Sequence, residues 1–183
     1  MMLEMPDSIN PLVLYDYNPK NPLVSVLIPC YNHERWVFEA LESVCSQTFR
    51  NIELIVIDDG STDNTRQKIK QFRRERTERF LYIEQKNQGI TNTLNRCLKY
   101  AHGKYLTILA SDDLMCLKKL EIQVDLLESL PHVDSVFCPQ YEIDENGVIT
   151  GVGGILGDYL INLIGIGRSE PAKPPDRWDV AEL

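Results

Sequence analysis

Short apolar runs alternate with longer amphipathic stretches over most of this chain. Four runs have the length and the turn-bounded ends of buried β-strands, at 23–28, 52–57, 80–83 and 105–109. Apolar residues recur at helical spacing over 37–45, 64–78, 90–101 and 117–127. Strands and helices that alternate with connections of a few residues predict an α/β fold, in which a mostly parallel sheet is flanked by helices.

Residues at the ends of these segments predict local structure. Pro29 is expected to end the first strand, and Asn32 is expected to cap the helix that follows, because its side chain can accept a backbone N–H bond. The helix over 90–101 is expected to bury Ile90 and Leu98. Gly103 is expected to close this helix as its C′ glycine.

The two ends of the chain differ from its middle. Four prolines among polar residues near the N-terminus predict an extended arm. Towards the C-terminus, the run 133–138 predicts a fifth strand, and Asn146-Gly147 predicts the turn of a hairpin. We therefore divide the chain into an arm, an α/β domain and a C-terminal region, over 1–22, 23–150 and 151–183.

Composition and charge narrow the classes of function. The chain has 183 residues, of which 43% are hydrophobic, and its net charge of −8 argues against nucleic acid as a partner. Five scattered cysteines without a C-x-x-C pair predict reduced thiols and a cytoplasmic protein. The N-terminus has neither the basic region nor the apolar region of a signal peptide, and no stretch is long and apolar enough to span a bilayer.

Polar clusters follow three of the predicted strands, at 29–32, 58–61 and 111–113. If these strands are parallel, all three clusters lie at the edge of the sheet where α/β proteins bind ligands. The adjacent carboxylates of Asp112 and Asp113 favour a hard divalent cation such as Mg²⁺ or Mn²⁺. Capping of the next helix is an equally good explanation of these two acids.

The first two clusters are suited to a nucleoside. Tyr31 could stack on a flat ring, and Asp58 could accept a hydrogen bond from an N–H group of the base, while Lys86 and Gly89 approach from the next loop. Neither the G-x-G-x-x-G motif of dinucleotide-binding proteins nor the G-x-x-x-x-G-K-[ST] motif of P-loop proteins occurs. The pattern therefore predicts a nucleoside-diphosphate site without a glycine-rich phosphate loop.

Five motifs in this order resemble the family 2 glycosyltransferases of the GT-A fold. They are Val-Ser-Val-Leu-Ile-Pro-Cys-Tyr-Asn, Ser-Val-Cys-Ser-Gln-Thr, Glu-Leu-Ile-Val-Ile-Asp-Asp-Gly-Ser-Thr-Asp, Asn-Gln-Gly and Ala-Ser-Asp-Asp, at 24–32, 43–48, 53–63, 87–89 and 110–113. The resemblance extends over about 23–147. It implies a nucleotide-sugar donor, most often linked to UDP, a divalent metal, and inversion at the sugar carbon that an acceptor hydroxyl attacks.

The resemblance also implies roles for individual residues. Pro29 and Tyr31 would line the nucleoside pocket, with the backbone of Asn32 beside the ring and Glu34 close to it. Asp58 would bind the uracil. Of the two acids after the fourth strand, Asp112 would lie near the ribose and the sugar, and Asp113 would bind the metal.

The acceptor side of the family's site is not matched. Family members usually supply the general base from an acidic motif well beyond the metal-binding acids, and no such motif is identified here. Residues 151–183 resemble only the start of the acceptor half, whose substrate would be a glycan, a lipid-linked sugar or a protein. The apolar segment 155–166 favours a homodimer or a contact with the inner face of a membrane, or else a core element. A nucleotide-sugar binding module completed by a partner or by further residues is the alternative to an enzyme.

Overall fold

The computed structural model describes residues 21–76 and 80–153. The expected arm up to residue 20 and the apolar segment 155–166 lie outside the described residues. The chain divides into two compact units, one through Lys118 and the other from Lys119 onward, and each is described by itself.

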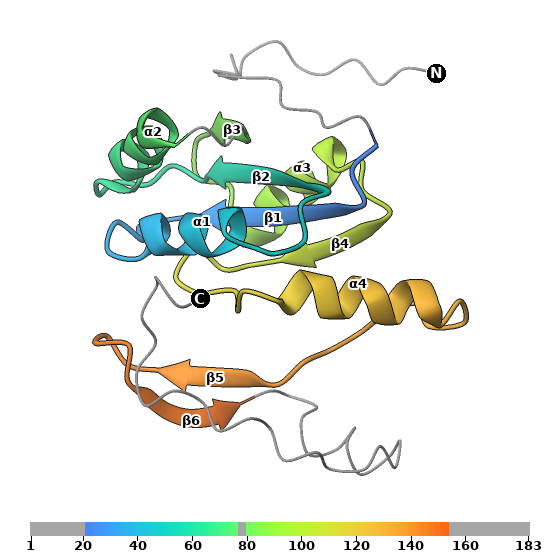
Figure 1. Cartoon of the computed structure of the whole chain (residues 1–183). Coiled ribbons are helices and arrows are strands. Elements are labelled where there is room, and N and C mark those ends of the chain that lie inside the picture. The colour runs from blue at the N-terminus through green and yellow to red at the C-terminus, as the bar shows by residue number, and fades with distance from the viewer. Residues whose placement is uncertain (1–20, 77–79, 154–183) are drawn as a thin grey trace, which may run out of the picture. The chain divides into compact units, whose positions relative to one another are not determined.

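Four parallel strands form the sheet of the first unit, in the order β3-β2-β1-β4 (Figure 1). They are β1 (Val24–Cys30), β2 (Ile52–Asp58), β3 (Leu81–Glu84) and β4 (Tyr105–Ile108). All seven residues of β1 are buried, as expected for an apolar strand between two neighbours. The predicted α/β fold with a mostly parallel sheet is confirmed.

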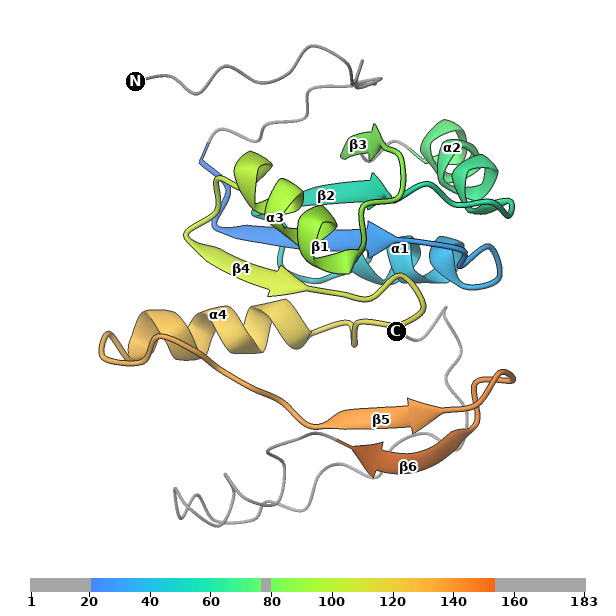
Figure 2. The same cartoon turned by 180° about the vertical axis from the view of Figure 1, so that it is seen from behind.

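Helices cover both faces of this sheet. Helix α1 (Val37–Cys45) contacts α2 (Thr65–Glu75), while α3 (Ile90–Tyr100) packs on β1 and β2. Figures 1 and 2 show α1 and α3 on opposite faces. The core on the α3 side consists of residues from three strands and the helix, Leu27, Ile55, Ile57, Ile83 and Cys97.

Two expectations about the end of β1 are wrong. Pro29 lies inside the strand, paired in register with Ile57, and the strand continues through Cys30. Asn32 does not cap α1, which begins at Val37. Asn32 instead adopts a left-handed backbone conformation with φ of 55°, and its side chain accepts the backbone N–H of Thr62. Asn32 therefore stabilises the loop after β1 and not the start of α1.

Gly103 does not close α3 as a left-handed glycine. The helix ends at Tyr100 in an extended cap residue, Ala101, and Gly103 lies two positions further on. A Cβ atom on Gly103 would lie 2.6 Å from the backbone nitrogen of Ser25. Glycine is therefore required because the chain passes directly against the start of β1, which the periodicity of α3 does not reveal.

A buried carboxylate fixes this close approach. Glu53 Oε1 accepts hydrogen bonds from Ser25 Oγ at 2.5 Å, from the backbone N–H of His102 at 2.5 Å and from that of Gly103 at 3.1 Å. Glu53 is 4% exposed, so its charge is compensated by these donors rather than by water. The amino end of the sheet is thus joined to the turn between α3 and β4.

The apolar face of α3 is less buried than the helical spacing of its apolar residues predicts. Ile90 and Leu98 are exposed, because the helix contacts β1 and β2 and only Thr93 and Cys97 are fully covered. The prediction that Ile90 and Leu98 are buried is therefore wrong. The apolar stripe of α3 is wider than the surface against which it packs.

The second unit contains α4 (Lys119–Ser129) and an antiparallel hairpin of β5 (Gln140–Ile143) and β6 (Ile149–Gly153). Gly147 has φ of 76°, so the predicted Asn-Gly turn is confirmed. The strand expected at 133–138 is absent, because no strand within 80–153 pairs with this segment. None of the helices described here is long and apolar enough to cross a membrane.

The cysteines agree with the expectation of reduced thiols. None of the five, all within the described residues, takes part in a disulfide. Burial raises the pKa of the Cys97 thiol to about 12 and raises that of Cys30 further, so both remain protonated packing groups.

Candidate functional site

The carboxyl ends of the parallel strands bring the polar clusters to one edge of the sheet. Cys30 and Asp58 are register partners at the ends of β1 and β2. Strand β4 is parallel to β1 and ends at Ile108, three residues before Ser111. The spatial arrangement expected of the three clusters is therefore present.

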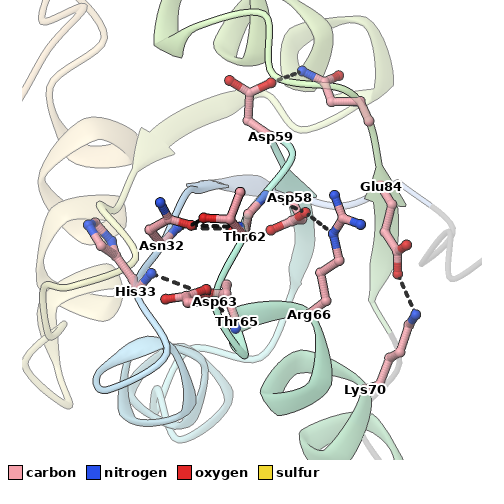
Figure 3. A network of polar contacts seen from close by, with 12 residues as sticks. Asn32, His33, Asp58, Asp59, Thr62, Asp63, Thr65, Arg66, Lys70 and Glu84 are labelled. Atoms are coloured by element: carbon pink, nitrogen blue, oxygen red, sulfur yellow. Dashed lines mark hydrogen bonds and ion pairs between the residues drawn. The ribbon is translucent and has the colours of Figure 1, made fainter.

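The loop after β1 is bound directly to the loop after β2. The backbone N–H of Asn32 donates to Ser61 Oγ at 3.0 Å, and Asn32 Oδ1 accepts the N–H of Thr62 at 2.8 Å. The N–H of His33 donates to Thr65 Oγ1 at 2.8 Å (Figure 3). Because both side-chain and backbone groups take part, the first loop is held in one position relative to the second.

Two acids extend this connection. The N–H of Glu34 donates to Asp63 Oδ2 at 3.0 Å, and Glu34 Oε2 accepts the N–H and the side-chain amide of Asn64, each at 2.7 Å. Burial alone would raise the pKa of Asp63, but bonds from the side chain and backbone of Thr65 and from Glu34 lower it. Glu34 is thus a residue that holds the two loops together.

Asp58 is completely buried at the end of β2. Its Oδ2 atom accepts bonds from Arg66 Nε at 2.7 Å and from the N–H of Ser61 at 3.2 Å (Figure 3). The hydrogen bond to Asp58 raises the pKa of Arg66, which keeps the guanidinium charged. The Oδ1 atom of Asp58 has no hydrogen-bond partner in the described part of the chain. One oxygen is therefore fixed and one is available to a ligand that reaches it.

The neighbouring Asp59 binds a different loop. Its Oδ1 accepts bonds from Gln85 Nε2 at 2.7 Å and from the N–H of Gln88 at 2.8 Å, and its Oδ2 accepts the N–H of Gly89 at 2.9 Å. The sequence pattern predicted a role in the site for Asp58 and none for Asp59. The adjacent pair of acids at a strand end was the signal that either could contribute to the site.

Gly60 allows the two loops to meet. It has φ of 77°, and a Cβ atom there would lie 2.6 Å from the backbone nitrogen of Asn87. Lys86, the residue before Asn87, is exposed. Gly89 also adopts a left-handed conformation, with φ of 82°. The loop that carries Lys86 and Gly89 therefore lies against the end of β2, as the sequence predicts.

The third cluster is a tight turn with two carboxylates. The N–H of Asp113 donates to the carbonyl oxygen of Ala110 at 3.0 Å, and α4 begins only at Lys119. Capping of a helix is therefore excluded as the role of these acids. Burial and the adjacent charge of Asp112 raise the pKa of Asp113, an effect that His33 opposes.

These acids do not form a complete metal site by themselves. Within residues 21–76 and 80–153, no group of three or more His, Cys, Asp or Glu side chains is arranged to hold a metal ion. Two adjacent carboxylates, one with a raised pKa, nevertheless suit a hard cation that takes its other ligands from water and from a bound diphosphate.

The remaining predicted residues differ in accessibility. Tyr31 follows β1 directly and is 44% exposed, so its ring is available for stacking. Pro29 is buried within β1 and can contribute to a pocket only as part of its floor. Asp112 is exposed beside the same edge.

His33 is a second residue to which the sequence assigns no role in the site, yet its Nδ1 atom lies 2.7 Å from Ser111 Oγ and 3.5 Å from Asp112 Oδ1. No pattern in the sequence indicates this contact, because the two segments are brought together only by the pairing of β1 with β4.

Residues 25–173 match the model of the family described as glycosyl transferase family 2. The chain belongs to this family. It is 38% identical over 129 residues to an Escherichia coli protein, UDP-Glc:alpha-D-GlcNAc-diphosphoundecaprenol beta-1,3-glucosyltransferase WfgD, covering 70% of this chain and 49% of WfgD. The resemblance inferred from the five motifs is thereby confirmed.

Solved glycosyltransferase structures share the fold. Residues 1–349 of Staphylococcus aureus TarS, in complex with UDP-GlcNAc, match with a TM-score of 0.54 and 27% identity, over 67% of this chain and 38% of that one. The mannosyltransferase PcManGT from Pyrobaculum calidifontis, in complex with GDP-Man and Mn²⁺, matches with a TM-score of 0.55 and 26% identity, over 58% of this chain and 32% of that one. The expected GT-A fold is confirmed.

The chain spans less than half of the length of the first curated relatives that it matches, from 17% to 49% of them. Activity, substrates and partners of those longer proteins therefore do not transfer directly to this chain.

Proposed function

We propose that this chain forms the donor-binding part of an inverting glycosyltransferase, which transfers a sugar from a nucleotide-diphospho-sugar to an acceptor hydroxyl. The observation that carries the proposal is the convergence of the ends of β1, β2 and β4, with their aromatic and acidic side chains, at one edge of the sheet. The name of WfgD and the UDP-GlcNAc complex of TarS favour UDP as the nucleotide. The alternative of a binding module without activity is not favoured, since these relatives are transferases.

The nucleoside is proposed to bind at the ends of β1 and β2. Tyr31 would stack on the base, Pro29 and the backbone of Asn32 would border the pocket, and Glu34 would support it from the loop. Asp58 would accept the N–H of uracil at Oδ1, the atom without a hydrogen-bond partner. Asp59 is the competing candidate, and substitution experiments distinguish the two acids.

The diphosphate is proposed to bind between the loop that carries Lys86 and Gly89 and the acids after β4. Asp113 would hold Mg²⁺ or Mn²⁺, and Asp112 would lie near the ribose and sugar. When bound, the cation stabilises the negative charge that develops on the leaving diphosphate. The complex of PcManGT with Mn²⁺ supports this part of the proposal.

The acceptor side is proposed only in outline. The acceptor would be a glycan, a lipid-linked sugar or a protein, and a carboxylate would accept the proton of its hydroxyl. No general base is assigned to the described residues. Asp144 forms the hairpin turn by accepting the N–H groups of Asn146 and Val148, and Asp158 lies outside the described residues. A cytoplasmic location, peripheral contact with the inner membrane face and a homodimer belong to the same proposal.

Calorimetric titration with UDP, UDP-Glc, UDP-GlcNAc and GDP-Man, each with and without Mn²⁺, tests the proposal. We expect binding of a uridine nucleotide that Mn²⁺ strengthens. Asp113→Asn should remove the Mn²⁺-dependent part of the affinity and leave the melting temperature close to that of the unaltered protein. Absence of binding by every nucleotide would contradict the proposal, and an unchanged Mn²⁺ effect in Asp113→Asn would contradict the role of that residue.

A second titration assigns the acid that binds the base. Asp58→Asn should weaken the binding of UDP more than the binding of pyrophosphate, because only UDP carries the uracil N–H. Asp59→Asn is the matched variant, since Asp59 directly follows the end of β2 and is also a buried acid. Equal losses for UDP and pyrophosphate in Asp58→Asn, together with a UDP-specific loss in Asp59→Asn, would transfer the role to Asp59.

A further inference from the structure

His33 connects two segments that lie far apart in the sequence. Its Nδ1 atom lies 2.7 Å from Ser111 Oγ and 3.5 Å from Asp112 Oδ1. Ser111 is completely buried, so its hydroxyl has no alternative bond to water. The imidazole therefore joins the loop after β1 to the turn after β4 through a short hydrogen bond with Ser111 and a longer contact with the Asp112 carboxylate.

The backbone of His33 is fixed independently of its ring. Its N–H donates to Thr65 Oγ1, and its carbonyl oxygen accepts the N–H groups of Trp36 and Val37 at 3.1 Å and 2.9 Å. The ring also meets the indole of Trp36 edge to face, with centroids 5.9 Å apart. With backbone and ring plane both held, the direction of Nδ1 is set before any ligand binds.

We infer that His33 is a positioning residue, which orients Asp112 for the nucleotide sugar by holding the turn after β4 against the loop that borders the nucleoside. This inference rests on the proposed function and assigns a role to a residue with no role in it so far. Asp112 is 44% exposed at its side chain, and its only described contact with a basic group is with His33. Without that contact, the carboxylate is free to rotate into water, so the ligand itself must order it.

The atom that makes the contact suggests a sharp test. An asparagine amide occupies roughly the place of imidazole Nδ1, whereas a glutamine amide reaches the place of Nε2. His33→Asn should therefore preserve the bond to Ser111, while His33→Gln and His33→Ala should lose it. His132→Ala is the matched control, because His132 is an exposed histidine in the second unit.

Calorimetric titration of the full chain with UDP in the presence of MnCl₂ provides the measurement. We expect His33→Ala and His33→Gln to bind UDP on the order of tenfold more weakly, the effect typical of residues that orient a ligating group. His33→Asn should remain within about threefold of the unaltered protein, which corresponds to less than one ordinary hydrogen bond. Melting temperatures should show that all three variants remain folded.

The outcomes separate this inference from the proposed function. If the unaltered protein binds UDP and all His33 variants bind equally well, or if Asn is no better than Gln, the positioning role is wrong and the proposed function stands. If the unaltered protein binds neither UDP nor any of the other nucleotides titrated, both are wrong. Ser111→Ala adds a coupling test, since combining it with His33→Ala should weaken binding no further than either change alone.

Discussion

Replacing Arg66 by alanine would leave the carboxylate of Asp58 buried without its cationic partner. In the native structure, Arg66 Nε lies 2.7 Å from Asp58 Oδ2, and Asp58 has no exposed surface. Removing one member of a buried ion pair typically costs about 3–5 kcal/mol. Because the Arg66 side chain is itself 35% exposed and the N–H of Ser61 still donates to Asp58, we expect a loss no larger than the lower limit, about 3 kcal/mol.

The same helix provides a matched control. Lys70, one turn beyond Arg66 on α2, lies 2.7 Å from Glu84 on β3, but the two side chains are 41% and 21% exposed (Figure 3). A partly exposed pair of this kind contributes about 0–1 kcal/mol, so Lys70→Ala should change stability little. The two substitutions remove a cation from the same element and differ mainly in the burial of the acid.

Urea unfolding followed by circular dichroism measures both losses. A further variant, Arg66→Met in an Asp58→Asn background, should cost much less than in the native background, because no buried charge remains to be compensated. If Arg66→Ala destabilised the protein no more than Lys70→Ala, the buried ion pair would not be what fixes Asp58, and its base-binding role would lose its structural support.

Four further substitutions test other parts of the fold. Glu53→Ala should destabilise the protein by about 3 kcal/mol, because one buried and two partly buried donors lose their acceptor, and a loss below about 1 kcal/mol in urea unfolding would contradict this. Gly60→Ala should lower the melting temperature and weaken UDP binding, because its Cβ would overlap the backbone of Asn87. Gly89→Ala, with a positive φ but open space around the Cβ position, should have the smaller effect on melting. The pKa of Asp63 is lowered in the native state, so its stabilisation is complete above the unfolded value, about 3.9, and is lost as the pH falls through the native value. Asp63→Ala should therefore destabilise the protein at neutral pH and much less in strong acid, and an equal loss at both would contradict the assignment.

The sequence predicted the sheet because its strands are apolar over most of their length. A fully buried strand such as β1 needs no knowledge of its partners to be recognised, and the acids at the ends of β2 and β4 follow once the strands are parallel. The family motifs narrowed the predicted function from nucleotide binding in general to that of a glycosyltransferase. These parts depend on local pattern and on general topology.

Other features depend on contacts between distant segments. Asn32 has the residue type of a helix cap, but its bonds to the loop after β2 and its left-handed backbone give it a different role. Gly103 follows a helix as a C′ glycine would, yet close contact with Ser25 is what requires it. His33 carries no local signal at all. Such roles are decided by tertiary neighbours, which a single sequence does not specify.

The central place of β1 has a consequence for synthesis of the chain. Residues 24–27 pair on one side with 52–55 and on the other with 105–108, so the strand of this sheet that is synthesised first lies beside the one that is synthesised last. Until β4 emerges from the ribosome, one edge of the buried strand β1 has no neighbour, and unpaired edges of this kind attract other chains. The nascent protein thus exposes this edge while the segment between β1 and β4 is being synthesised.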